Sequence, residues 1–291
     1  MDNASDDDTC AIVERQRRSM PCLRLVRNER DLGPGASRNI GLGLASGEWR
    51  ALLDADDWFA PTRLERLIAR AEQVGASIIA DNQILTTASG TPIRPLFQPE
   101  TPIEQIGLEA FLRRDRFVRI GTLGTLKPVF RATFLDATRV KYDTDPGLRV
   151  GEDALFYLSC LLAGAFIYLW AEPLYFYRQH SDSLSRSVDA RALHVAREKT
   201  SELLVDARRT ASPTLAALID QRIADIDAMI AYREMICAMK DARWADAAVC
   251  FIRNWQRSAF LLHRAGMSCL RIFYAAAREI SAERRPSRPL Q

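Results

Sequence analysis

Three carboxylates follow an apolar segment closely enough to do chemistry together. Asp54, Asp56 and Asp57 come directly after Trp49-Arg-Ala-Leu-Leu53. If that segment is a strand, the carboxylates lie at its carboxyl end, where open α/β sheets bind their ligands. Carboxylates so close repel one another unless a cation lies between them, and a hard divalent ion carrying phosphate oxygens suits the position. The alternative, that Asp57 or Thr62 caps a helix starting near Pro61, explains one carboxylate at most and not three.

A second acidic pair precedes an apolar run about a hundred residues later. Glu152 and Asp153 follow Gly151 and stand directly before Ala154–Ala163. Carboxylates at a helix N-terminus are favoured by the helix dipole, which is the structural explanation. Two adjacent carboxylates beside a buried element also suit a general base, whose protonation depends on local charge and burial. The pair alone leaves both interpretations open.

Two further segments carry weaker signals. His180 lies in the polar segment Tyr177–Ser185, where a lone histidine is usually only solvated. The turn Gly33-Pro-Gly35 leads into an expected helix with Arg38 in its first turn. Backbone amides at a helix start, with an arginine beside them, can hold phosphate, although glycine-rich turns into helices are common.

The elements that must position these residues alternate along the first half of the chain. The pattern predicts strands at 23–26, 49–53 and 76–80 and helices at 36–46 and 61–74. Such alternation indicates an α/β fold, with a mostly parallel sheet flanked by helices. Residues 86–125 are expected to form an irregular loop region over the sheet, with a short helix near 108–114. We expect one domain over residues 1–188 and a helical region over 189–291.

Composition excludes several classes of protein. The 291 residues are 48% apolar and 26% charged with a net charge of +3, which fits a globular chain and disfavours a nucleic-acid binder. Six scattered cysteines without a Cys-x-x-Cys pair, and no leader sequence, predict reduced thiols in the cytoplasm. Residues 154–171 lack charge, but Gly164 separates a helix-like half from a strand-like half, which favours a buried helix and a strand over a membrane span.

The order of these motifs resembles family 2 glycosyltransferases of the GT-A fold. The resemblance covers residues 1 to about 187 and includes 2–9, which looks like the family's Asp-Asp-x-Ser-x-Asp-x-Thr segment. A narrower resemblance is to enzymes of bacterial exopolysaccharide assembly, of the succinoglycan glucosyltransferase type. It rests on the segments Ala80-Asp-Asn82, Leu123-Gly-Thr-Leu-Lys-Pro128 and Arg149-Val-Gly-Glu-Asp153.

The resemblance implies a role for each matching residue. Asp153 would be the base that deprotonates the acceptor, with Glu152 as its neighbour. The donor would be a nucleotide sugar, with uridine diphosphate as its nucleotide, contacted by Asp2, Arg38, Asp54 and His180. Asp56 and Asp57, in the family's Asp-x-Asp motif, would hold a divalent cation, Mg²⁺ or Mn²⁺.

These roles combine into one reaction. The cation offsets charge on the departing diphosphate, while the carboxylate takes the proton of an attacking hydroxyl. A single displacement inverts the anomeric carbon, so the resemblance implies an inverting transferase acting on a saccharide or lipid-linked saccharide acceptor.

One departure from the family pattern leaves rival functions open. Family members begin with a strand, a helix and a second strand, whereas Met1 falls where the second strand should end. The expectation is an N-terminally truncated domain, and the first rival is an inactive remnant or non-enzymatic fragment that keeps the cleft. A metal-dependent phosphatase also opens its site with Asp-x-Asp, but needs Thr or Val two residues after the second Asp, where this chain has Trp58.

The basic C-terminal residues raise a question about location. Arg257, Arg264, Arg271 and Arg278 recur every seven residues, so on a helix they form one drifting stripe. A solvated basic face is the simpler interpretation. The alternative is peripheral contact with anionic lipid at the inner face of the membrane, where lipid-linked acceptors lie. The sequence predicts no nucleic-acid partner.

Overall fold

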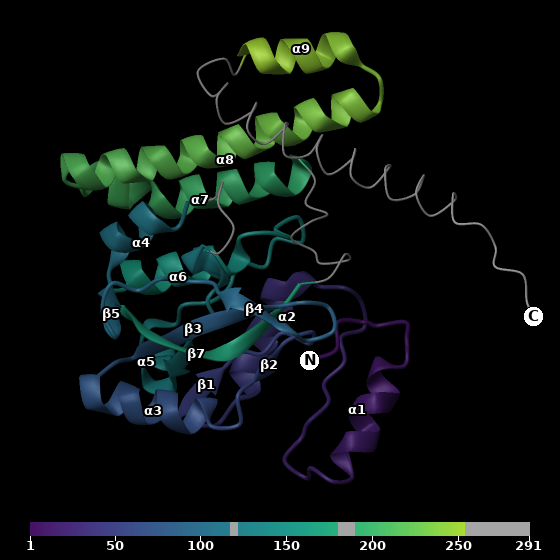
Figure 1. Cartoon of the computed structure of the whole chain (residues 1–291), viewed down its shortest axis with the longest axis vertical. Coiled ribbons are helices and arrows are strands. Elements are labelled where there is room, and N and C mark those ends of the chain that lie inside the picture. Colours follow the sequence, from purple (N-terminus) through teal and green to yellow (C-terminus); the bar gives the residue numbers. More distant parts are fainter. Residues whose placement is uncertain (117–121, 180–189, 254–291) are drawn as a thin grey trace, which may run out of the picture. The chain divides into compact units, whose positions relative to one another are not determined.

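The computed structural model describes residues 1–116, 122–179 and 190–253 of the chain. It divides into two compact units, Met1–Ile223 and Ala224–Gln291, which are described separately. The first unit contains the sheet and the helices that cover it (Figure 1).

A seven-stranded sheet forms the centre of the first unit within the described residues. Its main path runs β1-β6-β3-β7-β2, with β4 paired to β3 and β5 paired to β7. The strands are β1 (Trp49–Ala51), β2 (Trp58–Phe59), β3 (Ile78–Thr86), β4 (Pro92–Pro95), β5 (Ile103–Ile106), β6 (Val129–Arg131) and β7 (Ile167–Arg178).

The expectation of a mostly parallel sheet is wrong. Of the strand pairs described, β3 and β7 run parallel, and the other pairs are antiparallel. The cause is β6, a strand that the sequence pattern did not predict, which enters between β1 and β3 in the opposite direction. The short strands β2, β4 and β5 then add to β7 and β3 in antiparallel orientation. The α/β class itself is confirmed.

Helices cover both faces of the sheet because alternate residues of β3 point to opposite sides. Ile79 packs with Leu67 and Ala71 of α3 (Arg63–Val74). Ile78 and Ala80 belong to the larger core, which includes the apolar helix α6 (Glu152–Leu162). This period-two division fixes which face each helix covers. The remaining helices of the first unit are α1 (Thr9–Arg17), α2 (Gly33–Leu44), α4 (Leu108–Arg114), α5 (Ala132–Thr138), the 3₁₀ turn η1 (Leu123–Thr125) and α7 (Ala190–Thr210).

Several local predictions are confirmed, and two are not. Residues 86–125, expected to be irregular apart from one short helix, also contain the strands β4 and β5, which pair with β3 and β7. The helices over 36–46, 61–74 and 108–114 form as α2, α3 and α4, and residues 154–171 divide into α6 and β7. The expected strand at 23–26 does not form. The one β-type pairing next to it among the described residues is an isolated bridge between Asp2 and Arg27. Among the described helices, none has both the length and the apolar character needed to cross a membrane.

The first unit extends well beyond residue 188. Leu193 and Ala196 of α7 are buried, and Ile219 of α8 (Pro213–Lys240) lies in the main core cluster. A buried ion pair joins Arg222 of α8 to Asp115 at 2.7 Å. The boundary between the two compact units therefore lies between Ile223 and Ala224. That residues 1–188 form the transferase domain stays a prediction.

The described part of the second unit is a pair of helices. It contains the end of α8 and α9 (Trp244–Arg253), and the Cys250 thiol donates to the carbonyl of Ala231 at 3.1 Å. The four arginines of the basic stripe lie outside the described residues.

Candidate functional site

The two acidic motifs meet in the structure through shared cations. Arg38 donates from Nη1 to Asp153 Oδ1 at 2.7 Å and from Nη2 to Asp54 Oδ1 at 3.1 Å. Lys127 Nζ lies 2.6 Å from Asp153 Oδ2 and 2.9 Å from Asp54 Oδ2. Asp54 and Asp153, 99 residues apart in sequence, are thus bridged twice. The segment after β1 and the start of α6 therefore lie side by side.

Glu152 joins the same cluster. Its Oε1 accepts a hydrogen bond from Arg38 Nη1 at 2.7 Å. Burial raises the pKa of Glu152, and the adjacent Asp153 charge raises it further, which Arg38 only partly offsets. The cluster therefore contains three carboxylates and two cations, with a carboxyl group whose protonation is sensitive to local charge.

The cations of the cluster stay charged although they are buried. Burial acts to lower the pKa of Arg38 and of Lys127. Nearby negative charges, that of Asp153 above all, outweigh burial and raise both pKa values above their ordinary values. Burial alone would raise the pKa of Asp54, but Lys127 and Arg38 outweigh it and hold that pKa below its ordinary value. Opposite charges at this range stabilise each other's ionised forms.

Helix α2 is held against the neighbouring loop, and this contact places Arg38. The Asn39 side chain donates to the Tyr142 carbonyl at 2.9 Å and accepts from the Tyr142 amide at 2.8 Å. The Arg38 guanidinium lies 5.5 Å from the centre of the Tyr142 ring. Gly35 permits this approach, since a Cβ there would lie 2.2 Å from the Asp143 carbonyl oxygen.

Asp57 anchors the end of the loop to β7. It accepts from the Tyr175 hydroxyl at 2.6 Å and from the Arg178 amide at 2.8 Å. Burial raises the pKa of Asp57 to about 6 despite these two bonds. Of the two capping candidates, Thr62 occupies the N-cap position of α3 but makes no side-chain capping bond, and Asp57 does not occupy that position.

The residues present fit a divalent ion that is held partly by its substrate. Within the described residues, no group of three or more potential ligands is already arranged as a metal site. Both oxygens of Asp54 contact cations, whereas Asp56 is exposed at the end of the same segment. One or two carboxylates with substrate phosphate oxygens are sufficient for Mg²⁺. Asp56 would supply part of that coordination, and Asp57 would add to it through the lone pairs that the Tyr175 hydroxyl and the Arg178 amide do not use.

Asp2 lies in a buried position next to Arg27. Its amide donates to the Val26 carbonyl at 2.8 Å, and its Oδ2 lies 3.3 Å from Arg27 Nε. A hydrogen bond with Ser5 is the largest influence that lowers the pKa of Asp2. The Cys10 thiol lies near the carboxyl and also lowers this pKa, but Oδ1 is buried and has no hydrogen bond of normal geometry among the described residues. A buried acceptor of this kind calls for a donor group, which a bound molecule can supply.

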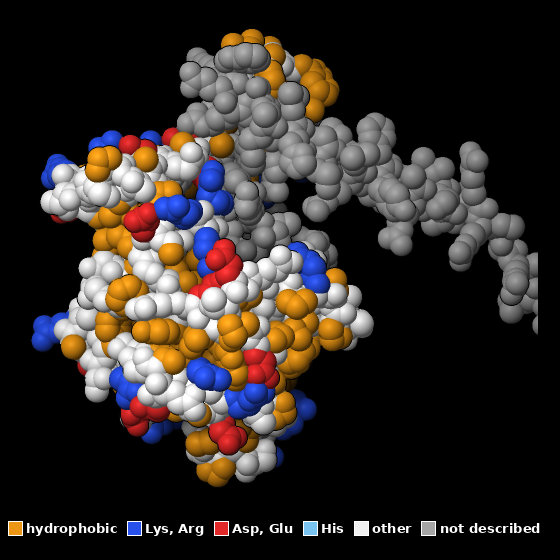
Figure 2. Space-filling view, turned by 60° about the vertical axis from the view of Figure 1, so that its left-hand side comes forward, with side chains coloured by type: hydrophobic (Ala, Val, Ile, Leu, Met, Phe, Trp, Pro, Cys, Tyr) orange, Lys and Arg blue, Asp and Glu red, His pale blue; other side chains and the backbone are white. Residues whose placement is uncertain are grey.

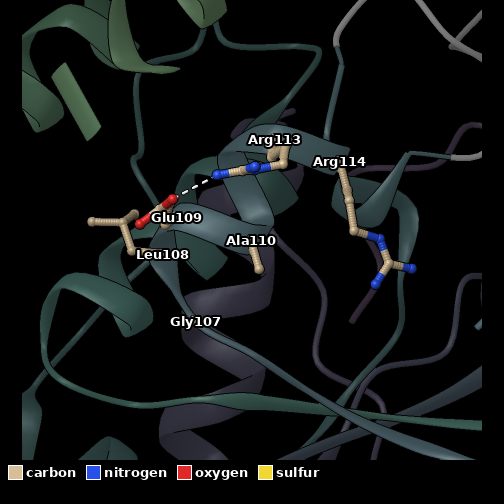
Figure 3. A pocket seen from close by; sticks show the side chains of 6 residues that line it. All are labelled: Gly107, Leu108, Glu109, Ala110, Arg113 and Arg114. Atoms are coloured by element: carbon tan, nitrogen blue, oxygen red, sulfur yellow. Dashed lines mark hydrogen bonds and ion pairs between the residues drawn. The ribbon is translucent and has the colours of Figure 1, made fainter. Parts of the chain in front are cut away.

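His180 lies outside the described residues. A surface hollow is lined by residues 107–110 with Arg113 and Arg114 at α4, where Arg113 pairs with Glu109 at 2.6 Å (Figure 3). It contains none of the strand-end carboxylates. Acidic and basic side chains lie beside one another over the face shown in Figure 2.

The fold and the site define a class of protein. Solved structures of S. aureus TarS share the fold: residues 1–349 in complex with UDP-GlcNAc give a TM-score of 0.55 at 16% identity, covering 88% of this chain and 81% of that one. The same residues of TarS in complex with UDP give a TM-score of 0.50 at 16% identity, covering 91% and 81% of the two chains. The sheet with its flanking helices is therefore a GT-A fold.

Sequence comparison points to one family. Residues 1–133 match the family model "Glycosyl transferase family 2". This range includes Asp2, Arg38, the three strand-end carboxylates and Lys127.

Curated relatives cover more of the chain. Succinoglycan biosynthesis protein ExoO of Rhizobium meliloti (strain 1021) is 35% identical over 188 residues, which are 64% of this chain and 53% of that protein. ExoU of the same organism is 35% identical over 173 residues, 57% and 48% of the two chains. The chain thus spans about half the length of these relatives.

Lys127 is the residue of the cluster that sequence reasoning did not assign a role. It stood within the segment 123–128 that supported the narrower resemblance, but a single lysine there gave no sign of burial. The signal that was available is its position directly before Pro128 in a largely apolar stretch, where an uncompensated charge is costly.

Proposed function

We propose that the chain is an inverting glycosyltransferase that moves a sugar from a uridine diphosphate sugar to a hydroxyl group of a saccharide or lipid-linked saccharide. The product would belong to a cell-surface polysaccharide or exopolysaccharide. The observation that carries the proposal is the double bridge of Asp54 and Asp153 by Arg38 and Lys127. Arg38, Asp54 and Lys127 lie in the range 1–133 that matches the family 2 model. It brings a donor-side carboxylate and a candidate base to one place.

Each residue has a role that its chemistry allows. Asp153 takes the proton of the acceptor hydroxyl as that oxygen attacks the anomeric carbon. Asp54 is assigned to the ribose side of the donor, and Arg38 to its phosphates, since a guanidinium can pair with phosphate oxygens. Asp56 and Asp57 would hold Mg²⁺ or Mn²⁺, which offsets charge on the diphosphate when bound.

Support for the uridine nucleotide comes from the comparisons and from Asp2. The structures of TarS that share the fold were solved with UDP-GlcNAc and with UDP. The unpartnered Oδ1 of Asp2 is an acceptor that the N–H of a uracil would satisfy. The names of ExoO and ExoU support succinoglycan-like polysaccharide synthesis as the setting.

A panel of nucleotide sugars tests the proposal. The chain is incubated with Mn²⁺ and each uridine diphosphate sugar, and release of free UDP is followed with and without added saccharide acceptors. UDP release stimulated by an acceptor is the expected result. Binding of UDP without any turnover would instead favour the non-enzymatic fragment. The absence of both binding and turnover would refute the proposal.

Peripheral membrane contact in the cytoplasm completes the proposal. Its support is the seven-residue spacing of Arg257, Arg264, Arg271 and Arg278 in sequence, together with the lipid-linked acceptors expected of such an enzyme. Co-sedimentation with vesicles tests it. Binding to anionic vesicles that disappears at high salt is expected, whereas equal recovery in the supernatant with neutral and anionic lipid would leave only a solvated basic face.

A further inference from the structure

Lys127 is a buried cation at the junction of the two acidic motifs. Its side chain is 5% exposed, compared with 17% for Arg38. Its ammonium group contacts Asp54 Oδ2 and Asp153 Oδ2 at 2.9 and 2.6 Å. Arg38 is more exposed and contacts Glu152 as well. A bound donor therefore has easier access to Arg38 than to Lys127.

The backbone around Lys127 is fixed by a second buried ion pair. Its carbonyl accepts from Arg63 Nη2 at 2.6 Å, and the same guanidinium donates to Asp81 Oδ1 at 2.6 Å. Asp81 in turn accepts from the Leu174 amide at 3.0 Å, which ties the pair to β7. Pro128 follows and restricts Lys127 to extended backbone angles. The lysine is thus held in place independently of the carboxylates it contacts.

The energetic cost of this arrangement indicates a role beyond stability. Taking an ammonium group out of water costs on the order of several kcal/mol, and well-packed apolar residues often replace a buried ion pair without loss of stability. Burial acts to lower the pKa of Lys127, yet Asp153 and Asp54 raise it above its ordinary value, so the charge is retained. We therefore take the positive charge of Lys127, held beside Asp54 and Asp153, to be the contribution of this residue.

We propose that Lys127 is a positioning residue for sugar transfer, which holds Asp54 and Asp153 in one arrangement and leaves a cation beside Asp153 when Arg38 pairs with the donor phosphates. This inference rests on the function proposed above. Lys127 does not touch the reacting atoms; it acts through Asp153. Without it, Arg38 would be the one cation in contact with Asp153 among the described residues.

The charge balance around Asp153 sets the expected pH dependence. The ionisable groups that face Asp153 are Arg38 from α2, Lys127, Glu152 from α6, Asp54 after β1, and the Tyr142 and Tyr157 hydroxyls. Removing the Lys127 charge leaves Arg38 as the one cation among them. A carboxylate that loses an opposite charge takes up its proton at higher pH. As the solution is acidified, a variant without the Lys127 charge should therefore lose activity at a higher pH than the parent does.

The test compares the parent with Lys127→Met and Lys127→Arg. In Lys127→Met we expect kcat to fall by about 10²-fold while donor KM changes less, as for a disturbed general base. The acidic limb of the pH–rate profile should move up by about one pH unit or more. Lys127→Arg, which keeps the charge, should return that limb toward the parent position. If Lys127→Met does not fold, Lys127→Gln keeps a hydrogen-bond donor and removes the charge.

Arg222→Met is the matched control, because Arg222 is equally buried and pairs with Asp115 at 2.7 Å outside the cluster. It should cost stability without moving the acidic limb. The inference is overturned if Lys127→Met and Arg222→Met lose activity alike and the limb of Lys127→Met stays at the parent position.

A direct titration separates this inference from the proposed function. The Asp153 carboxyl is followed by ¹³C NMR with pH in the parent and in Lys127→Met, which needs no turnover. An upward movement of its midpoint supports the role of Lys127, and an unmoved midpoint refutes it. Absence of turnover in the parent would refute the proposed function alone.

Discussion

Both carboxylate oxygens of Asp153 contact cations, and its substitution should affect turnover more than UDP binding. Arg38 and Lys127 contact its two oxygens at 2.7 and 2.6 Å. Asp153→Asn keeps the size of the side chain and removes the basic oxygen. Turnover should fall by about 10²-fold or more, the contribution of a general base, while UDP affinity changes little. Steady-state UDP release and calorimetric UDP binding measure the two effects.

A variant Asp153→Asn with near-normal turnover would move the base to Glu152. That carboxyl is the next candidate, because burial and the Asp153 charge raise its pKa. Glu152→Gln is the matched variant: it should reduce turnover less than Asp153→Asn if Asp153 is the base.

Asp57 should make stability depend on pH. Burial raises its pKa in the folded protein to about 6 from an ordinary value of 3.8. A group whose folded pKa is raised binds its proton more tightly when folded. Its contribution to the free energy of unfolding is therefore present below pH 3.8 and is lost as pH rises through about 6.

Urea unfolding without metal ions, at pH 5 and pH 7.5, checks this contribution. The difference in the free energy of unfolding between the two pH values should be smaller in Asp57→Asn than in the parent. Asp136→Asn, an exposed carboxylate on α5, is the control and should leave the difference unchanged. An identical pH difference in Asp57→Asn would show that the carboxyl is ionised normally.

The residues of the site divide into those whose sequence context signals their role and those whose context does not. The three strand-end carboxylates, the Glu152-Asp153 pair and Arg38 stand in motifs with characteristic spacing, and the structure brings Arg38, Asp54, Glu152 and Asp153 into direct contact. Lys127 is a single lysine whose partners come from distant segments. No local pattern encodes such a tertiary contact, so sequence reasoning did not assign it.

Helix α2 depends on one glycine for its position. A Cβ at Gly35 would lie 2.2 Å from the Asp143 carbonyl oxygen, so Gly35→Ala must displace α2 or the loop. We expect a loss of about 1–3 kcal/mol in the free energy of unfolding, as for overpacking, and weaker UDP binding because Arg38 moves with the helix.

Gly43, in the same helix, is the matched control. A Cβ there meets nothing within 4 Å. Gly43→Ala should therefore stabilise the protein by about 0.4–1 kcal/mol through the lower entropy of the unfolded chain. Urea unfolding of the two variants distinguishes them, and equal stability would contradict the close approach at Gly35.

Elements were predictable where periodicity is long and not where strands are short. The helices α2, α3, α4 and α6 follow apolar periodicity or clear end signals and lie close to their expected ranges. β6 has three residues, too few for an alternating pattern, yet it determines the direction of both neighbouring pairs. The direction of the sheet therefore could not be predicted from alternation of strands and helices.

The whole chain combines a sheet-containing unit with helices that follow it. The core of the first unit includes residues of α7 and of α8 up to Ile219, so these helices are part of the same packed body as the site. Two buried ion pairs, Arg63–Asp81 and Arg222–Asp115, tie separate segments of this unit together. Composition signals helix in this region, but not which helices share the core, since that depends on contacts distant in sequence.

Calorimetric binding of UDP with Mn²⁺ tests the central claim, that the strand-end carboxylates hold a divalent ion and the diphosphate of a nucleotide sugar. The parent and the control Asp136→Ala should bind UDP with Mn²⁺ and lose that binding with excess EDTA. Asp56→Ala should bind at least about tenfold more weakly, a loss of about 1.4 kcal/mol. If Asp56→Ala bound UDP with Mg²⁺ or Mn²⁺ as tightly as the parent, the assignment of this site would be contradicted.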